Sequence, residues 1–446
     1  MTKTWAVFHD RNARLFLTAV TVSGFGTSAL WLASGVWVKD LTGSDGLAAL
    51  CMLAMWAPTL AGPLLGALAD RVPRQPLLIG GSLLLAALLP VLFAVDGPDR
   101  VWLLLTVLFV YGAAGVVHDA AESALVAGAV APSLLGGFNG LRMAVTEGMK
   151  LVAPLAGAGL YAVQGGPGVA LLDAITFVLA ALLYARLRVR ESRPDPLAPP
   201  TSAGTRDEPP GRAATAAEAP GRRTTPGLSP TSTDRRTPSR RTPVGAGPRH
   251  IWAHPILRPL VLAGGTTMLF AGLNGALIYA VIDGLGHSPA YAGALYAAQG
   301  AGSVAVGLVS GPALRRLGER RFAAYGIALT AVAAGLRAIP SDPLALACSA
   351  AIGAGLPCVL IAALTAVQRE TPDALRGRAV ATAHTLVYTP NVLGLAAGAT
   401  LVELVDQRPL SALLGVAWPA TAVPLFQRPA SASRIASRSP SDANPA

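Results

Sequence analysis

The chain has 446 residues, of which 52% are hydrophobic and only 13% are charged. Average soluble domains contain about 25% charged residues, so this composition excludes a soluble protein. The formal net charge of +11 comes from arginines in the tails and between hydrophobic runs, a distribution that indicates membrane topology and argues against a nucleic acid partner.

Long apolar runs recur along the whole chain. A membrane-spanning helix needs about 20 apolar residues, and about twelve runs approach this length. They lie near residues 15–38, 45–68, 76–95, 101–126, 141–163, 168–187, 257–283, 290–313, 322–340, 344–366, 379–402 and 409–426. Because lipid offers no hydrogen-bond partners and the runs lack the alternation of barrel strands, we expect helices. The predicted fold class is all-α integral membrane, with twelve transmembrane helices.

A polar segment interrupts the runs between residues 190 and 250. It is rich in Pro, Thr, Ser, Ala and Arg and nearly lacks aromatic side chains, which is typical of a disordered linker. Six runs precede it and six follow it. The expected domains are an N-terminal six-helix bundle (1–189), a disordered basic cytoplasmic linker (190–250), a C-terminal six-helix bundle (251–428) and a disordered tail (429–446).

Arginines collect on one side of the predicted topology. If Met1 is cytoplasmic, that side holds Arg11, Arg14, Arg71, Arg74, Arg315, Arg316, Arg320, Arg321, Arg369, Arg376, Arg378, Arg428 and Arg434. The other side keeps only Lys39, Arg100, Arg337 and Arg408. The positive-inside rule therefore predicts a multi-pass protein with both termini in the cytoplasm. The first run is too long for a signal-peptide core and no small-residue cleavage site follows it, so we expect it to remain as the first span.

The balance of basic residues suggests a source. Only Lys3, Lys39 and Lys150 are lysines among the 35 basic residues. This excess of arginine, together with abundant Ala, Gly and Pro, suggests a GC-rich bacterium, and so an inner or plasma membrane.

Two loops at corresponding places in the halves resemble each other. Gly66-Ala-Leu-Ala-Asp70-Arg71-Val-Pro73-Arg74 follows the second run, and Gly307 to Arg321, with Arg315 and Arg316, follows the eighth. An internal repeat of this kind is expected of transporters built from two related halves with a substrate site between them.

These loops resemble a known family signature. The first matches the pattern G-x-L-a-D-r-x-G-r-k of the major facilitator superfamily at Gly66, Leu68, Asp70, Arg71 and Arg74, with Pro73 and Gln75 as departures; the second resembles its weaker C-terminal copy. Residues 139–142 and 368–378 look like loops of its multidrug and siderophore exporter branches. The resemblance implies two six-helix bundles around a central cavity, alternating access, and Asp70 in a charge relay that locks the outward-open state.

The residues of the first loop also suggest gating without the family. Asp70 is an acid at a helix end within a basic loop, so it needs a partner such as a helix N-terminus or an arginine. Arg71 and Arg74 either contact anionic lipid headgroups or serve only as topology determinants.

Charges within a span are costly, so each is a candidate for function. Asp119 and Glu122 share one face of the fourth span, where solvation is the alternative to a role in proton coupling. Glu147 and Lys150 are three apart on the fifth span, and they either neutralise each other or couple proton uptake to movement, while Lys150 could also meet an anionic substrate. Asp173 is expected about a turn inside the sixth span, where water can reach it.

The fifth span also contains Ala153-Pro154-Leu155-Ala156-Gly157, which resembles the antiporter signature g-x-x-x-G-P-x-x-G-G with Ala153 in place of glycine. A proline among small residues favours a bend and close helix contact. The fourth span departs from the family pattern, because it has no arginine, whereas drug and proton antiporters of the family usually carry one there.

Polar and aromatic residues within the other spans are candidates for the cavity lining. They are Trp31, Asn274, Gln299, His384, Tyr388 and Asn391, together with Phe25, Trp37 and Trp56. A small-molecule site is usually apolar with a few polar anchors, although each polar residue alone is more often a contact between helices.

Motifs for catalysis are missing from the sequence. It contains no phosphate-binding loop, no legible nucleophile and base pair, and no metal-ligand spacing, and Cys51, Cys348 and Cys358 lie in apolar runs. We therefore expect no enzyme activity, no cofactor and no metal. The sequence predicts a monomeric secondary transporter whose partners are a small molecule, protons and the lipid bilayer, most simply a proton-coupled exporter of a drug, antibiotic or siderophore. A nutrient importer and a membrane sensor that binds without transport are the alternatives.

Overall fold

The computed structural model describes residues 9–62, 64–65, 72–129, 135–188 and 246–426. Some side chains within helices are also outside the description, including those of Glu147 and Lys150. The greater part of the predicted linker, the whole predicted tail and the loop with Gly66, Asp70 and Arg71 lie outside the described residues.

Every regular element in the described part of the chain is a helix. In the N-terminal half these are α2 (Arg11–Thr42), α3 (Asp45–Trp56), η1 (Ala57–Ala61), α5 (Arg74–Leu88), η2 (Leu89–Ala94), η3 (Pro98–Arg100), α6 (Val101–Ala129) and α7 (Leu135–Ala185). In the C-terminal half they are α8 (Ala246–Ala253), α9 (Leu257–Ala276), α10 (Ile278–Gly284), η4 (Pro289–Tyr291), α11 (Ala292–Leu336), α12 (Asp342–Glu370), α13 (Asp373–Leu404), α14 (Gln407–Ala417), η5 (Trp418–Ala422) and α15 (Val423–Phe426).

The number of spans depends on how broken helices are counted. Eight described helices are long and apolar enough to cross a membrane, and the bent pair α9 and α10 makes a ninth. Both α7 and α11 consist of two helices joined at a glycine with positive φ, Gly165 (φ 67°) and Gly318 (φ 73°), a conformation that glycine adopts without steric cost. Counting their halves separately and adding the shorter apolar helix Asp45–Ala61 gives the twelve apolar segments that the sequence predicts.

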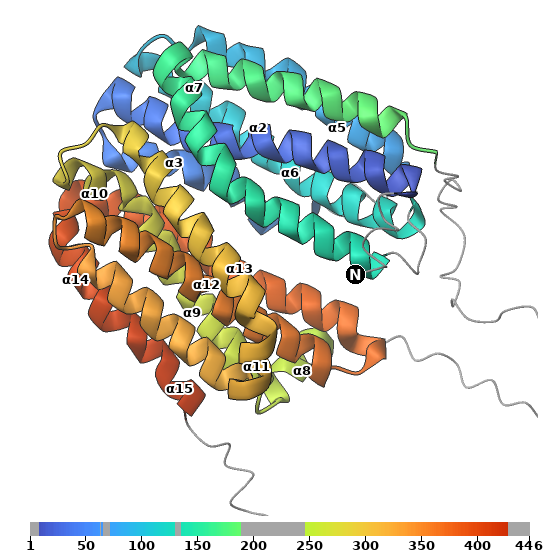
Figure 1. The fold of residues 1–446 in the computed structure, drawn as a ribbon, viewed down its shortest axis with the longest axis vertical. Helices are drawn as coiled ribbons and strands as arrows, with labels where there is room; N and C mark the ends of the chain where they lie inside the picture. The colour runs from blue at the N-terminus through green and yellow to red at the C-terminus, as the bar shows by residue number, and fades with distance from the viewer. Residues whose placement is uncertain (1–8, 63, 66–71, 130–134, 189–245, 427–446) are drawn as a thin grey trace, which may run out of the picture.

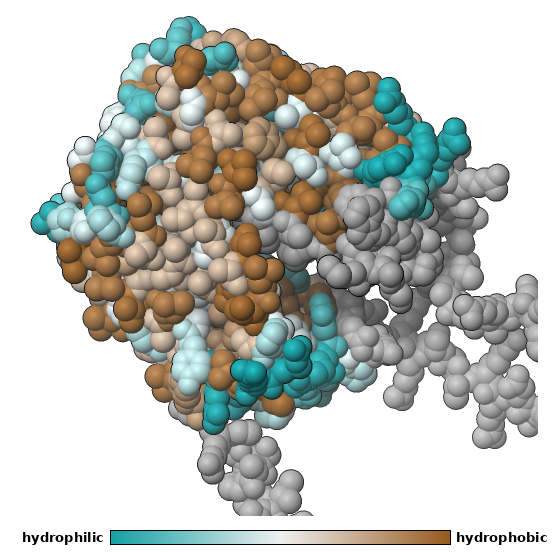
Figure 2. Space-filling view, in the orientation of Figure 1, coloured by the Kyte–Doolittle hydropathy of each residue, from teal (hydrophilic) through white to brown (hydrophobic). Residues whose placement is uncertain are grey.

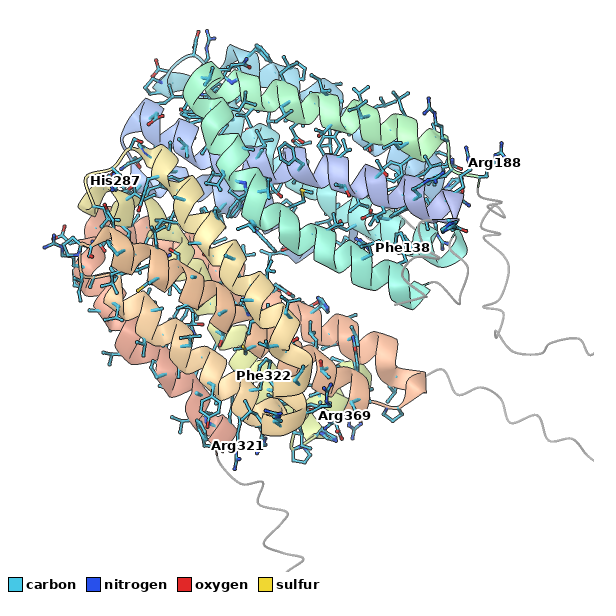
Figure 3. All side chains as sticks on the ribbon, viewed as in Figure 1. Phe138, Arg188, His287, Arg321, Phe322 and Arg369 are labelled. Atoms are coloured by element: carbon cyan, nitrogen blue, oxygen red, sulfur yellow. The ribbon has the colours of Figure 1, made fainter. Side chains whose placement is uncertain are left out.

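The helices form two bundles that lie side by side (Figure 1). The bundles are close together at the end where α10 is drawn and diverge toward the opposite end. We call these the closed end, near His287, and the open end, near Arg188 and Arg369 (Figure 3). The surface between the two ends is largely apolar, with polar residues gathered at the ends (Figure 2), as expected of a protein that faces lipid along its sides.

Three clusters of buried side chains hold the bundles together. Phe16 contacts Phe138 and Tyr184 edge to face within the N-terminal half. A second cluster surrounds Trp418 in the C-terminal half. The largest cluster crosses the boundary, because residues of α2 and α6 share it with Tyr279 of α10 and other C-terminal residues. The two halves are therefore joined through packed apolar side chains, and this interface frames the candidate site.

Candidate functional site

An ion cluster joins the halves at the closed end. The ammonium of Lys39, near the end of α2, lies 2.7 Å from Asp45 of α3 and 2.6 Å from Asp283 of α10. It also donates to the carbonyl oxygen of Gly43 at 2.9 Å. The Lys39 side chain is only 8% exposed, whereas Asp283 is 47% exposed. Lys39 therefore keeps one acidic partner in its own half and shares a second, more exposed one with the other half.

A carboxylate from the C-terminal half lies at the N-terminus of α3. Glu403, near the end of α13, accepts hydrogen bonds from the Ser44 hydroxyl at 2.5 Å and from the Gly46 amide at 2.7 Å. Ser44 is also the N-cap of α3, since its hydroxyl accepts from the amide of Leu47. The first amides of a helix lack partners within the helix and attract negative charge. Glu403 thus supplies part of the cap of a helix in the opposite half.

Close packing continues from the closed end into the interface. The Tyr279 hydroxyl donates to the carbonyl oxygen of Leu32 at 3.4 Å, and its ring end lies against Gly35, where any side chain would overlap it. Trp31 of α2 meets Tyr296 of α11 edge to face, with ring centroids 4.7 Å apart. The structure therefore places Trp31, a predicted cavity residue, in contact with the other half.

Asp173 occupies a buried polar site inside the N-terminal half. It is 0% exposed, and its carboxylate accepts hydrogen bonds from Tyr111 at 2.8 Å and from Thr176 at 3.1 Å. Tyr111 in turn lies 2.7 Å from the hydroxyl of Thr27 on α2. No described basic side chain lies within ion-pair distance of Asp173. Water does not reach Asp173 in this conformation, so the expectation of a water-accessible acid is wrong here, because α2 and α6 cover it.

A second acidic site lies nearer the open end. Glu122 of α6 is 4% exposed and forms an ion pair with Arg142 of α7 at 2.9 Å. Tyr184 also hydrogen-bonds Glu122 and lies 3.5 Å from His118. Solvation, the alternative considered for Asp119 and Glu122, holds only for Asp119, which is exposed. The sequence analysis did not predict Arg142 as the partner of Glu122. Arg142 lies on α7, and it gives α6, the fourth predicted span, an arginine partner that the sequence of that span does not contain.

Arg337 lies inside the C-terminal half rather than in an external loop. It is 3% exposed and follows the last residue of α11. Its guanidinium donates to Ser349 of α12 at 2.6 Å and to Asn274 of α9 at 3.5 Å. The prediction that Asn274 lines a cavity is not met in this conformation, because Asn274 is buried and forms a contact between helices.

Some of the other residues predicted to line the cavity are packed between helices, and others are exposed. His384 is exposed and stacks on Tyr388, with centroids 5.5 Å apart. Gln299 and Asn391 lie on tightly packed helices, where their backbone oxygens touch Gly353 and Gly272. The additional aromatic residues differ too, since Trp37 is buried against Gly166, Trp56 is 37% exposed and Phe25 is partly exposed.

The second copy of the gating motif lies at the open end. Gly307, Arg315 and Arg316 are exposed on α11, just before its break at Gly318. The guanidinium of Arg369 on α12 lies 2.5 Å from Glu319, which follows the break, and Figure 3 places Arg369 at the open end. Of the first copy, Arg74 is the first residue of α5. The structure therefore describes an ion pair beside the break in α11, next to the second motif copy.

Several residues of the closed end were not predicted as functional. The sequence analysis counted Lys39 as a loop charge and did not single out Asp45, Asp283 or Glu403. Their position in the sequence could have identified them, because each lies within a few residues of the end of an apolar run. In a bundle of antiparallel helices, every second connection lies on the same side, so these residues could be expected at one end. Among the described residues, no group of three or more His, Cys, Asp or Glu side chains could hold a metal ion.

Comparison with known proteins gives a family and a fold. A family model described as Major Facilitator Superfamily matches residues 15–274 and 260–443. Macrolide efflux protein A of Streptococcus pyogenes is 27% identical over 173 residues, which cover 38% of this chain and 42% of that protein. The alignment thus spans less than half of that relative's length.

Solved structures match over nearly the whole chain. A bacterial homologue of the iron transporter ferroportin in an inward-facing state has a TM-score of 0.64 at 15% identity, covering 94% of this chain and 99% of that one. The nucleoside transporter NupG has a TM-score of 0.64 at 13% identity, covering 94% and 100%. A POT family transporter in complex with a thioalcohol-conjugated peptide has a TM-score of 0.65 at 12% identity, covering 93% and 95%. At these identities the likeness concerns the fold.

Proposed function

Because the chain belongs to the major facilitator superfamily, we propose that it is a secondary transporter that exports a small amphipathic molecule in exchange for protons. Asp173 is the proton carrier in this proposal. The observation that carries it is a buried carboxylate with hydroxyl donors and no described cation nearby. Protonation removes the charge of such a carboxylate and so lowers the free-energy cost of burying it without a counter-ion.

Asp173 is a better candidate than the other acids of the N-terminal half. The charge of Glu122 is offset by Arg142 at 2.9 Å, so protonation would leave a partly buried arginine unpaired. Asp119 is exposed and interacts electrostatically with Arg142, so it also has a counter-charge. Glu147 with Lys150 stays a candidate pair on the backbone of α7, with side chains outside the description.

Helix α2 provides a physical connection from Asp173 to the closed end. Gly26 packs directly on Asp173 and Thr176, Gly35 packs on Tyr279, and Lys39 forms the ion cluster, all on this one helix. A change in the charge of Asp173 would alter its contact with α2 and thereby bias the helix that carries Lys39. Coupling needs a two-state element of this kind that both sites influence.

The proposed orientation places the open end in the cytoplasm. Arg188 and Arg321 lie at that end (Figure 3), and Asn12, next to Arg11, hydrogen-bonds the backbone oxygen of Arg188. The positive-inside rule assigns basic ends to the cytoplasm. The conformation would then be inward-open, with both termini and the linker in the cytoplasm. The membrane would be the inner or plasma membrane of a bacterium.

Export is favoured over import by the curated relative. The matched relative is named for macrolide efflux. Residues 139–142 and 368–378 resemble exporter loops in sequence, although the first lie within α7 and the second span the end of α12 and the start of α13. A macrolide or another antibiotic, a drug or a siderophore is the proposed cargo, carried by a monomer without a cofactor or enzyme activity. Gly307, Arg315, Arg316 and the first motif are proposed to gate the open end.

Everted membrane vesicles test the proposal. With an imposed inward proton gradient, a pH-sensitive dye reports proton release as candidate cargo molecules are added. We expect wild type to dissipate the gradient with at least one cargo, Asp173→Asn to lose this response at equal expression, and Asp96→Asn, which changes an exposed acid, to retain it.

Two other outcomes would change the proposal. A response that survives in Asp173→Asn but disappears in Glu147→Gln would move the proton carrier to α7's Glu147. No response to a broad panel would count against a proton-coupled exporter and favour a nutrient importer, or a sensor that binds its ligand without transporting it.

A further inference from the structure

Arg337 is a buried cation whose hydrogen-bond partners are all neutral. Its two bonds go to the hydroxyl of Ser349 and the amide oxygen of Asn274. Its Nε atom is buried without a hydrogen-bond partner, and no carboxylate among the described residues lies within ion-pair distance of the guanidinium. Arginine stays charged in proteins, so the C-terminal half encloses an uncompensated positive charge.

A purely structural role accounts poorly for this charge. Burying an ion without a counter-ion carries a large desolvation penalty, as in buried pairs that lose one partner. A neutral side chain could donate to Ser349 and Asn274 at a lower desolvation cost. The guanidinium is therefore expected to meet an anion at some stage of the protein's working cycle.

A second unsatisfied group lies close to Arg337. The Tyr296 hydroxyl is buried without a hydrogen-bond partner in the described part of the chain, and Tyr296 interacts electrostatically with Arg337. A carboxylate has two oxygens that can accept from an arginine and from a neighbouring hydroxyl together. Arg337 and Tyr296 each keep one donor that could bond an oxygen of such a group.

Tyr296 also connects this pair to the boundary between the halves. Its ring contacts Trp31 of α2 edge to face, so the same side chain touches the N-terminal half and interacts electrostatically with Arg337. If the closed end separates, this contact between the halves is lost. Arg337 would then be reached from the closed end, in the outward-open state, the side on which an exporter releases its cargo.

We propose that Arg337 and Tyr296 bind a carboxylate group of the transported molecule. The inference rests on the proposed transport function, and it narrows the cargo to amphipathic molecules that carry an anionic group. Asn274 and Ser349 hold the guanidinium in place from α9 and α12.

Ligand-dependent thermal unfolding of the purified full chain in detergent tests the site. The probe is 1-naphthoate, an apolar ring with one carboxylate; 1-naphthalenemethanol is its neutral counterpart, and sodium chloride at equal ionic strength is the anion control. A ligand that binds the folded state raises the unfolding midpoint in a saturable way. We expect saturable stabilisation of wild type by naphthoate only.

Variants identify the residues involved. Arg337→Gln should weaken naphthoate binding by about tenfold or more, and Tyr296→Phe by about fivefold, as for lost charged hydrogen bonds. Arg100→Gln, which changes an arginine that is 52% exposed, should bind like wild type. Should Arg337→Gln fail to fold, Tyr296→Phe still decides the matter, since unchanged affinity in that variant overturns the site.

The remaining outcomes are equally decisive. Equal stabilisation of wild type and Arg337→Gln would overturn the proposal, and so would an Arg337-dependent shift produced by chloride alone, because the site would then take a halide ion. Binding is measured here without a gradient or flux. Its failure would leave proton release by Asp173 untouched, and loss of proton release would leave the carboxylate site standing.

Discussion

Lys39 of α2 lies 2.6 Å from Asp283 of α10, and the two residues belong to different halves. Lys39 is nearly enclosed and has Asp45 of its own half at 2.7 Å, so its charge stays compensated when the halves separate. Separation of the halves breaks only the ion pair of Lys39 with the half-exposed Asp283. Ion pairs with an exposed partner stabilise a structure by only about 0.2–1 kcal/mol. The cluster can thus hold the closed end and still release it during transport.

The first prediction concerns this contact. Asp283→Asn should favour separation of the closed end by about 1 kcal/mol or less, a change of up to about fivefold in population. Spin labels at Asp99 and Asp406, two exposed positions at that end on opposite halves, would report the distance distribution. Asp342→Asn is the matched control, because Asp342 is equally exposed but pairs with His287 of its own half. A distribution shifted equally in both variants would contradict a role for Asp283 between the halves.

A close backbone contact gives a second prediction at the same end. A Cβ atom at Gly46 would lie 2.6 Å from the carbonyl oxygen of Ala399 and 2.7 Å from Cγ of Glu403. Gly46→Ala should therefore prevent full closure, increase the long-distance population of the same label pair and leave the unfolding midpoint nearly unchanged. Gly62→Ala, where a Cβ would meet nothing within 4 Å, should leave both measurements unchanged.

A glycine within one half should behave differently. A Cβ at Gly302 would overlap the carbonyl oxygen of Ala350, where α11 packs on α12. Gly302→Ala should lower folding stability, by about 1–3 kcal/mol for such overpacking, without a specific effect on the closed end. If Gly46→Ala lowers the unfolding midpoint as much as Gly302→Ala does, the contact at Gly46 serves folding rather than gating.

The fold could be predicted from the sequence because its signals are local. Apolar runs near 20 residues, and a loop motif that occurs twice, require only neighbouring residues to be read. The breaks in α7 and α11 were also predictable in place, since each falls between two expected runs.

The candidate site was predictable only in part, because partners far apart in sequence define it. Asp173 was identified as an acid within a span, but its enclosure depends on Tyr111 and on the packing of Gly26, which are contributed by other helices. Arg337 was counted as a loop charge because it lies at the end of a run. Its contacts with Asn274 and Ser349 come from other helices, so they could be seen only in the structure.

Another prediction tests the enclosure of Asp173 with two neighbouring glycines of α2. A Cβ at Gly26 would overlap side-chain oxygens of both Asp173 and Thr176, whereas one at Gly24 would meet nothing within 4 Å. Gly26→Ala should displace the carboxylate from its hydroxyl donors and abolish cargo-dependent proton release in everted vesicles. Gly24→Ala should transport normally at equal expression. Normal proton release in Gly26→Ala would show that the geometry around Asp173 is not needed for coupling.

The last prediction concerns the ion pair of Glu122 and Arg142. Glu122 is almost enclosed and Arg142 is 28% exposed, so removing the arginine should cost more than removing the acid, because it leaves the more deeply buried charge alone. In a double-mutant cycle of Glu122→Gln and Arg142→Gln, measured by unfolding in detergent, we expect a favourable coupling energy of about 1–3 kcal/mol. The exposed pair of Arg100 and Asp96, treated in the same way, should give about 0.5 kcal/mol or less. A coupling energy no larger than that of the exposed pair would mean that water screens the Glu122 site, and Glu122 would then rejoin Asp173 as a candidate for proton exchange.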